Sequence, residues 1–328
     1  MKTIAFFNNK GGVGKTTLVY HLAWMFSKLG KRVLVADLDP QANLTSMFLS
    51  EADLETLWDP DREEHASIMA PLSPIIRGLG DIGDAPVRRI KDTIHLIPGD
   101  LALSNFESNL SEAWGKCLDR QEPAFRTTSA FYRMMLKASE KTSADVVLID
   151  VGPNFGAINR AALICAEAVV VPLAPDLFSI QGLRNLGPTL KDWRLQWKSR
   201  LGQNPAGDLS LPEAIMNPVG YTVIQFGIRD SRPVKAYQKW SNRIPSTFDS
   251  LVLNQSPDVS TKTYDTDENC LGLLKHYRSL MPMAMEARRP IFDLKAADGA
   301  IGAHAKSVQD CGDDFKNLAQ NILSKYSF

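Results

Sequence analysis

Residues 2–17 read KTIAFFNNKGGVGKTT and contain three successive local signals. The apolar run at 2–8 predicts a short buried strand, and the residues after Lys15 place apolar side chains at helical spacing. Between them lies the glycine-rich turn KGGVGKTT at 10–17. Backbone N–H groups of such a turn, with the positive end of the next helix dipole, form a cradle for phosphate groups. The stretch therefore predicts a nucleotide-binding strand, loop and helix.

The loop also supplies the side chains that phosphate chemistry needs. Lys15 is placed to reach the β- and γ-phosphates, and the Thr16 hydroxyl is placed to ligate Mg²⁺. The ordinary P-loop has glycine where this chain has Asn9, and Lys10 adds a second lysine at the start of the loop. We expect the nucleotide to contact Gly11, Gly12, Val13, Gly14, Lys15, Thr16 and Thr17.

Strand-like and helical stretches alternate along most of the chain. A β-branched strand is predicted at 32–37, and further strands are predicted at 93–98, 145–151, 168–172 and 214–226. Alternation of this kind implies βαβ units and a mostly parallel, twisted sheet flanked by helices. The fold class is therefore α/β.

We expect a single elaborated domain over residues 1–328. A variable insertion or lid is expected at about 50–90, and an elaborated segment at about 200–270. Pro188 should kink or split the long helix predicted at 180–201. The later helices are expected at 234–244, 271–287 and 305–325.

Composition excludes several classes of protein. The 328 residues are 44% hydrophobic and carry 37 Lys+Arg against 37 Asp+Glu, which excludes a collagenous or wholly disordered chain. Zero net charge disfavours a globally basic nucleic-acid binder but allows a local basic face. The four cysteines lie far apart without a CxxC pair, so neither a zinc knuckle nor a disulfide framework is indicated. No run reaches the roughly 20 apolar residues that a membrane span needs, and we expect a cytoplasmic protein.

Three motifs together resemble one family. KGGVGKTT, DLDPQAN at 37–43 and DVVLIDVGP at 145–153 resemble the ParA/MinD family of deviant Walker A P-loop ATPases, and within it the ParA/Soj-type partition ATPases. The resemblance continues through APDLFSIQGL at 174–183 and RRPIFDL at 288–294. It implies a P-loop NTPase fold, ATP and Mg²⁺ as cofactors, and ATP hydrolysis.

The family also implies roles for individual residues. Lys10 would cross the interface of an ATP-bound sandwich dimer to the phosphates of the partner, as an arginine finger in trans does. Asp39 matches the aspartate that positions or deprotonates the attacking water. Asp150 matches the Walker B aspartate, and with Thr16 and Asp37 it would support Mg²⁺. The expected catalytic residues are thus Lys10, Lys15 and Asp39.

Two segments resemble the family's adenine pocket. Asn217, which follows a strand-like segment and precedes a proline, resembles its purine-contacting asparagine. Pro290, Phe292 and Asp293 resemble the second wall. Gly152 stands where a second proline is usual, and we expect it to loosen the turn that senses the γ-phosphate.

A stripe of basic residues is the candidate DNA-binding face. Arg232, Lys235, Lys239 and Arg243 fall at steps of three and four, which would align them on one side of a helix. ParA-type dimers bind DNA non-specifically through basic residues on late helices, and a local patch suffices for phosphate neutralisation. The resemblance implies an ATP-dependent homodimer associated with the nucleoid, and an unidentified ATPase-stimulating or cargo-adaptor protein. Sequence-specific operator binding is not expected, since the first strand starts at Lys2.

Other functions of the same fold remain open. An electron-transfer ATPase like the nitrogenase iron protein would need two cysteines, such as Cys117 and Cys165, to hold an iron–sulfur cluster. A membrane-associated positioning ATPase like MinD would need a basic amphipathic helix, whereas the C-terminal stretch 315–323 is poor in lysine and favours core packing. A ParA-like switch in a regulatory or defence operon would keep the chemistry and change the cargo.

Overall fold

The structure is a computed structural model that describes residues 1–59, 66–226, 228–229, 232–233, 239–256, 262–277 and 279–326. Its main strands are β1 (Lys2–Phe6), β2 (Val33–Asp37), β3 (Arg88–Lys91), β4 (Ile94–Ile97), β5 (Val146–Asp150), β6 (Ala168–Leu173), β7 (Asn217–Phe226) and β10 (Cys270–Lys275). They form an eight-stranded sheet in the order β10-β7-β6-β1-β5-β2-β4-β3. The predicted α/β class, with a mostly parallel sheet flanked by helices, is confirmed.

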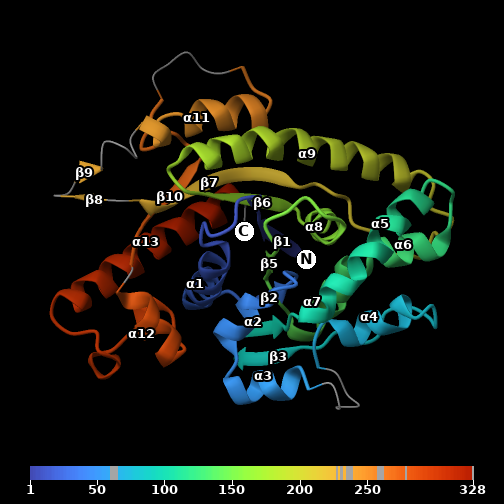
Figure 1. The fold of residues 1–328 in the computed structure, drawn as a ribbon, viewed down its shortest axis with the longest axis horizontal. Helices are drawn as coiled ribbons and strands as arrows, with labels where there is room; N and C mark the ends of the chain where they lie inside the picture. Colours follow the sequence, from blue (N-terminus) through green and yellow to red (C-terminus); the bar gives the residue numbers. More distant parts are fainter. Residues whose placement is uncertain are drawn as a thin grey trace. The chain divides into compact units, whose positions relative to one another are not determined.

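Figure 1 labels the α-helices of the described residues. They are α1 (Lys15–Lys28), α2 (Asn43–Phe48), α3 (Glu51–Leu57), α4 (Met69–Ile76), α5 (Phe106–Lys116), α6 (Glu122–Thr128), α7 (Ala130–Thr142), α8 (Ala157–Leu163), α9 (Leu177–Leu201), α11 (Ile244–Thr247), α12 (Leu280–Ala287) and α13 (Ala303–Lys325). Shorter elements are η1 (Leu101–Asn105), the π-helical turn η2 (Phe248–Val252), η3 (Ile291–Asp293), η4 (Ala296–Asp298), β8 (Ile228–Arg229) and β9 (Arg232–Pro233).

The chain divides into two compact units, each assembled from three segments. Unit 1 comprises Met1–Phe6, Phe26–Val169 and Leu190–Asn217. Unit 2 comprises Phe7–Met25, Val170–Thr189 and Pro218–Phe328, and it contains the glycine-rich loop.

Unit 1 is built on parallel pairing of β-branched strands. β5 pairs with β1 on one side and β2 on the other, and β2 pairs with β4; the edge strand β3 is antiparallel to β4. Every residue of β2 and β5 is buried, as expected of strands covered on both faces. The registers place Asp37 and Asp150 side by side at the carboxyl ends of these strands. Ligands of such sheets bind at that edge.

In unit 2, β7 and β10 form a second parallel pair. The helix α13 packs on β10. Phe315, Leu318 and Ile322 of α13 are buried. The ideal position of a Cβ at Gly272 of β10 is only 3.3 Å from the Leu318 side chain, so helix and strand pack in close contact. The predicted core packing of the C-terminal stretch is confirmed.

Two predictions of secondary structure are wrong, while the insertion or lid expected at 50–90 stays a prediction. Residues 270–275 form a strand and only 280–287 form a helix, because a short apolar run has no periodicity that separates the two. α9 continues through Pro188, and the leucines on either side of it, Leu186 and Leu190, are buried by packing that holds the helix. Part of the 50–90 segment is regular: α3, α4 and β3 lie within it.

Candidate functional site

The glycine-rich loop has the backbone conformation of a phosphate cradle. Gly12 and Gly14 adopt left-handed φ angles of 72° and 86°, which only glycine adopts without strain. α1 begins at Lys15, directly after the loop. The Lys15 side chain is buried, and its Nζ donates a hydrogen bond of 3.2 Å to the Asn8 carbonyl across the loop. Lys15 therefore lies across the loop, and its contact with the phosphates stays a prediction.

Lys10 has a different environment from Lys15. Its Nζ forms an ion pair with Asp176, just before α9, and lies 5.6 Å from the ring centroid of Phe178. Phe178 is 70% exposed, and about a quarter of the Lys10 side chain is accessible. The two lysines of the loop are thus held by different partners, one inside the cradle and one at the start of α9.

The start of α9 also packs against the base of the loop. Asn8 Nδ2 donates a 2.7 Å hydrogen bond to the Pro172 carbonyl at the end of β6, and Asn8 Oδ1 accepts from the Lys10 amide at 3.1 Å. A Cβ placed on Gly182 would lie 2.8 Å from Asn9 Oδ1 and 3.0 Å from Asn8 Oδ1. Asn9, at the position of the missing P-loop glycine, therefore packs on a glycine of α9.

Asp37 ends β2 and is completely buried. Its Oδ2 accepts hydrogen bonds from the Thr45 amide at 2.8 Å and the Thr45 hydroxyl at 2.7 Å. The same hydroxyl accepts a bond from the Gly99 amide at 2.7 Å. Burial raises the pKa of Asp37 to about 6, against the opposing effect of the Thr45 bonds. Asp37 thus fixes the start of α2, and its predicted support of Mg²⁺ stays a prediction.

Asp39 lies in the turn that follows β2. Its Oδ1 accepts from the Gln41 amide at 3.0 Å, and its carbonyl accepts from Ala42. A Cβ on Gly152 would lie 3.4 Å from Asp39 Oδ1, so the turn after β5 passes directly beside this carboxylate. Within unit 1, the structure brings Asp37, Asp39 and the fully buried Asp150 to one edge of the sheet, as the sequence predicts.

The turn after β5 is braced, in contrast to the loose turn that Gly152 predicts. Asn159 of α8 donates from Nδ2 to the Gly152 carbonyl at 2.8 Å and the Asn154 carbonyl at 2.7 Å. Glu107 of α5 accepts the amides of Ala157 and Ile158 at 2.5 and 2.9 Å, which caps the start of α8. Asn159 and Glu107 therefore hold in place a turn that Gly152 alone would leave loose.

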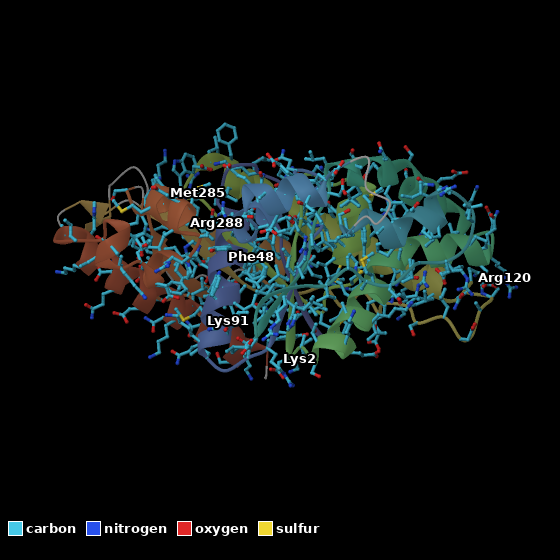
Figure 2. All side chains as sticks on the ribbon, turned by 90° about the horizontal axis from the view of Figure 1, so that it is seen from below. Lys2, Phe48, Lys91, Arg120, Met285 and Arg288 are labelled. Carbon is cyan, nitrogen blue, oxygen red and sulfur yellow. The ribbon has the colours of Figure 1, made fainter. Side chains whose placement is uncertain are left out.

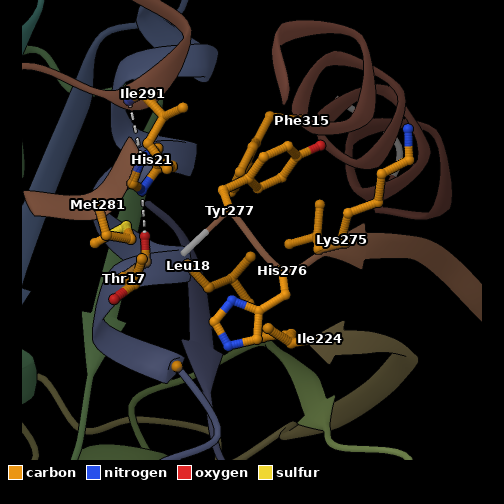
Figure 3. Close-up of a pocket in the computed structure, with 12 residues that line it drawn as sticks. Thr17, Leu18, His21, Ile224, Lys275, His276, Tyr277, Met281, Ile291 and Phe315 are labelled. Carbon is orange, nitrogen blue, oxygen red and sulfur yellow. Dashed lines mark hydrogen bonds between the residues drawn. The ribbon is translucent and has the colours of Figure 1, made fainter. Parts of the chain in front are cut away.

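A cavity of about 130 Å³ opens beside the loop in unit 2 (Figure 3). Its walls come from α1, the ends of β7 and β10, α12, η3 and α13: Gly14, Thr17, Leu18, His21, Ile224, Leu274, Lys275, His276, Tyr277, Met281, Ile291 and Phe315. Since most of these side chains are apolar and the cavity adjoins the cradle, it is the candidate pocket for a nucleotide base.

His21 is the buried polar group of this cavity. Its Nδ1 donates to the Thr17 carbonyl at 2.7 Å, and its Nε2 accepts from the Ile291 amide at 3.1 Å (Figure 3). The ring stacks on Phe315 with 4.9 Å between centroids. Burial lowers the pKa of His21 to about 4, so the ring is neutral. His21 therefore ties α1 to the segment around η3.

Comparisons with known proteins agree with this geometry. The AAA domain family profile matches residues 1–202 of the chain. The chromosome-partitioning ATPase Soj of Thermus thermophilus is 31% identical over 201 residues, covering 61% of this chain and 66% of Soj. The chain belongs to the ParA/MinD family of partition ATPases. The matched stretches span 42%, 66% and 47% of the first three curated relatives, so this family membership rests on part of their length.

Among the solved structures, two that resemble this chain do so over nearly its whole length. Protein DIP2308 from Corynebacterium diphtheriae superposes with a TM-score of 0.72 at 25% identity, covering 100% of this chain and 99% of the other. A plasmid partition protein from Borrelia burgdorferi bound to AMPPNP gives a TM-score of 0.60 at 21% identity, covering 99% of both chains. The second likeness concerns the fold alone.

The ParA/MinD resemblance predicts two walls of an adenine pocket, and of these only the second lies beside the cavity. Asn217 does not follow a strand: it is the exposed first residue of β7, at the amino end, whereas ligands bind at carboxyl ends. The expected contact from Asn217 to the base is therefore not supported. In the second wall, Ile291 lines the cavity, Phe292 meets His21 at 5.8 Å between centroids, and Pro290 precedes η3. Contact of Pro290, Phe292 and Asp293 with adenine stays a prediction.

Only part of the predicted basic helix at 234–244 lies within the described residues, which resume at 239. Arg232 lies in the two-residue strand β9, and Lys235 lies outside the described residues. Lys239 lies in a stretch, residues 239–241, that is helical as predicted, and Arg243 lies in the turn before α11. Both are exposed and lie 5.1 and 5.2 Å from the ring centroid of Trp240. The side chains of the predicted stripe that the structure describes are thus Lys239 and Arg243, which both lie beside the Trp240 indole.

The iron–sulfur alternative finds little support in the positions of Cys117 and Cys165. Burial raises the pKa of the Cys117 thiol to about 11 and raises that of Cys165, which donates to the Ala161 carbonyl at 3.0 Å. Both thiols are buried, so neither reaches a surface at which two protomers could share an iron–sulfur cluster. Among the described residues, no helix combines the length and apolar character required to cross a bilayer.

Several residues of the site escape prediction from the sequence. His21, Asp176, Glu107 and Phe315 lie in ordinary helical contexts or in a turn, and only the fold gives them partners. One local signal exists for His21: it lies four residues after Thr17 and thus on the same face of α1.

Proposed function

We propose that the protein is an ATP-dependent dimerisation switch of the ParA type. It binds ATP at the loop, closes into a homodimer, binds DNA without sequence preference, and returns to the monomer after hydrolysis. The observation that carries the proposal is the separation of the two loop lysines: Lys15 lies in the cradle, whereas Lys10 is engaged outside it. A cradle that already has its own cation leaves the second lysine for another site.

In this proposal Lys10 serves the partner protomer. When the dimer closes, Lys10 leaves Asp176 and reaches the phosphates of the nucleotide bound by the partner. A cation supplied in trans stabilises the negative charge of phosphoryl transfer, so dimer assembly also completes the active site. The exposed Phe178 beside Lys10 would be covered in the same step.

Mg²⁺ would bind together with the nucleotide. Proteins hold this ion with one or two carboxylates, substrate phosphates and water, not with a dedicated cage. Among the described residues, no group of three or more His, Cys, Asp or Glu is arranged to hold a metal by itself. The oxygen donors present, the Thr16 hydroxyl and the strand-end carboxylate of Asp150, have the chemistry that Mg²⁺ prefers. The ion would neutralise charge on the β- and γ-phosphates.

Asp39 is proposed to orient the attacking water. Its carboxylate accepts the Gln41 amide and its carbonyl accepts the Ala42 amide, and the turn at Gly152 passes beside the carboxylate. Slow hydrolysis would be stimulated by an adaptor protein that also links the switch to its cargo, either DNA or another body to be positioned. Lys239 and Arg243 are the residues of the proposed DNA face whose side chains the structure describes.

Two substitutions test the assignment of the lysines. Lys15→Ala should weaken ATP binding at least tenfold, or about 1.4 kcal/mol, measured by calorimetry. Lys10→Ala should leave ATP binding nearly intact and abolish ATP-driven dimerisation in light scattering. Lys91→Ala, which changes an exposed lysine of β3, serves as the matched control (Figure 2). A Lys10→Ala protein that dimerises normally with ATP would show that Lys10 is only a loop charge.

A further inference from the structure

A hollow of about 560 Å³ lies between α9 and the segment α11–η2, and it shares no lining residue with the cavity of Figure 3. Its walls are Arg184 of α9 and Ser246, Thr247, Ser250 and Leu251 of α11–η2. All of these residues belong to unit 2. One cation and three hydroxyl groups thus face the same open space.

The two walls are held in contact by their backbones. A Cβ on Gly187 of α9 would lie 1.8 Å from the Leu251 carbonyl oxygen, so only glycine permits this approach. Leu251 lies in the π-helical turn η2, a geometry that is frequent at functional sites. The spacing between Arg184 and the hydroxyls is therefore fixed by packing and does not depend on flexible loops.

The charge of the hollow is positive. Arg184 is exposed and has no hydrogen bond or ion pair to any residue that the structure describes. No acidic residue lies in 177–189, and the acid of α11–η2, Asp249, is buried and accepts a hydrogen bond from Asn269 at 3.0 Å. Arg243, one residue before α11, adds a second exposed cation.

The hydroxyls can turn toward an anion. Ser246 and Thr247 donate to the Arg243 carbonyl at 3.3 and 2.7 Å, and Ser250 donates to the Ser246 carbonyl at 2.7 Å. A hydroxyl hydrogen rotates to suit its partner, and a charged oxygen is a stronger acceptor than a carbonyl. A guanidinium with nearby hydroxyls is a donor set that matches phosphate.

We infer that this hollow binds backbone phosphates of duplex DNA, with Arg184 as the central cation. The inference rests on the proposed DNA binding and adds to it Arg184 and the hydroxyls of α11–η2, which lie next to Arg243 of the basic stripe. Arg184 contacts the phosphate, the hydroxyls of α11–η2 orient it, and Arg243 extends the contact along the strand. Because these groups contact backbone only, the recognition is independent of base sequence.

The test compares two arginine substitutions in the full chain carrying Asp39→Ala and loaded with ATP. Arg184→Gln should lower affinity for a short labelled duplex about tenfold. It should also reduce the log–log slope of affinity against salt by about 0.9 for each phosphate that is no longer neutralised. Arg120→Gln, at an exposed arginine of unit 1, is the charge-matched control and should change neither (Figure 2). Unchanged ATP affinity and circular dichroism confirm that both variants are folded.

Two further probes identify the ligand. A duplex with neutral methylphosphonate linkages should bind the Asp39→Ala protein equally weakly with and without Arg184→Gln, because the contact is to phosphate charge. An unchanged affinity and salt slope in Arg184→Gln would overturn the inference alone. Failure of the Asp39→Ala protein itself to bind any duplex would overturn the proposed DNA step as well. Arg184-dependent binding to phosphatidylglycerol vesicles in place of duplex would also overturn the inference.

Discussion

His21 should make the unfolding free energy of the protein fall at acid pH, and the substitution His21→Gln separates this effect from the other titrating groups. The folded chain holds the ring neutral, with both nitrogens bonded to backbone groups, and the pKa is lowered from 6.5 to about 4. The unfolded chain therefore binds a proton more readily below pH 6.5. Stability from this group is complete above pH 6.5 and falls as the pH drops toward 4.

The magnitude follows from these two pKa values. Between neutral pH and pH 5 the wild type should lose about 2 kcal/mol of unfolding free energy through His21. Asp37 acts in the opposite sense, because its raised pKa favours the folded state as the pH falls. The pH dependence of the wild type alone would mix the two effects, so a difference between proteins is needed.

The non-titrating variant His21→Gln provides that difference. At pH 7 it should be less stable by about 1–3 kcal/mol, since a buried backbone group loses its partner. At pH 5 the gap to the wild type should be about 2 kcal/mol smaller, because only the wild type loses stability through this site. Urea denaturation followed by circular dichroism at both pH values measures the gap. A gap that is the same at pH 5 and pH 7 would refute the neutral, doubly bonded His21.

Two further substitutions test the packing around the site. Gly182→Ala should weaken ATP binding severalfold in calorimetry without unfolding the protein, because its Cβ would lie 2.8 Å from Asn9 Oδ1 at the base of the loop; unchanged affinity would show that the loop tolerates the shift. Thr45→Val should lower the unfolding free energy by about 1–3 kcal/mol, since the buried Asp37 carboxylate loses a hydroxyl donor; urea denaturation at pH 7 measures it, and an equally stable variant would contradict that role.

Local signals predict the parts of the fold that are continuous in sequence. The strand, loop and helix at 2–28 and the buried strand β5 carry strong patterns of their own, and the three aspartates follow from strand ends. The prediction for residues 270–275 is wrong because their strand conformation depends on pairing with β7, which lies far away in sequence. Burial of the leucines that flank Pro188 likewise overrides a local helix breaker.

The same limit applies to the candidate site. Asn217 precedes a proline and so resembles the family's purine-contacting asparagine. Whether it can contact a base depends on which end of its strand it occupies, and the sequence pattern does not show that. Asp176, the partner of Lys10, lies 166 residues away in the chain, and Ile291, one of the two hydrogen-bond partners of His21, lies 270 residues away. No spacing rule connects such pairs, whereas the glycines of the loop all fall within the single stretch 10–17.

The cap that Glu107 places on α8 has a consequence for evolution. A Cβ at Gly156 would lie 2.7 Å from Glu107 Oε1, so the carboxylate and the absence of a side chain are fitted to each other. A homologue that acquires a side chain at the position of Gly156 must shorten or move the residue at the position of Glu107. The two positions should therefore change together in descent, and a lineage that has lost the glutamate need only move the Asn154 side chain, whose Oδ1 would lie 2.8 Å from the new Cβ, to fill the glycine position.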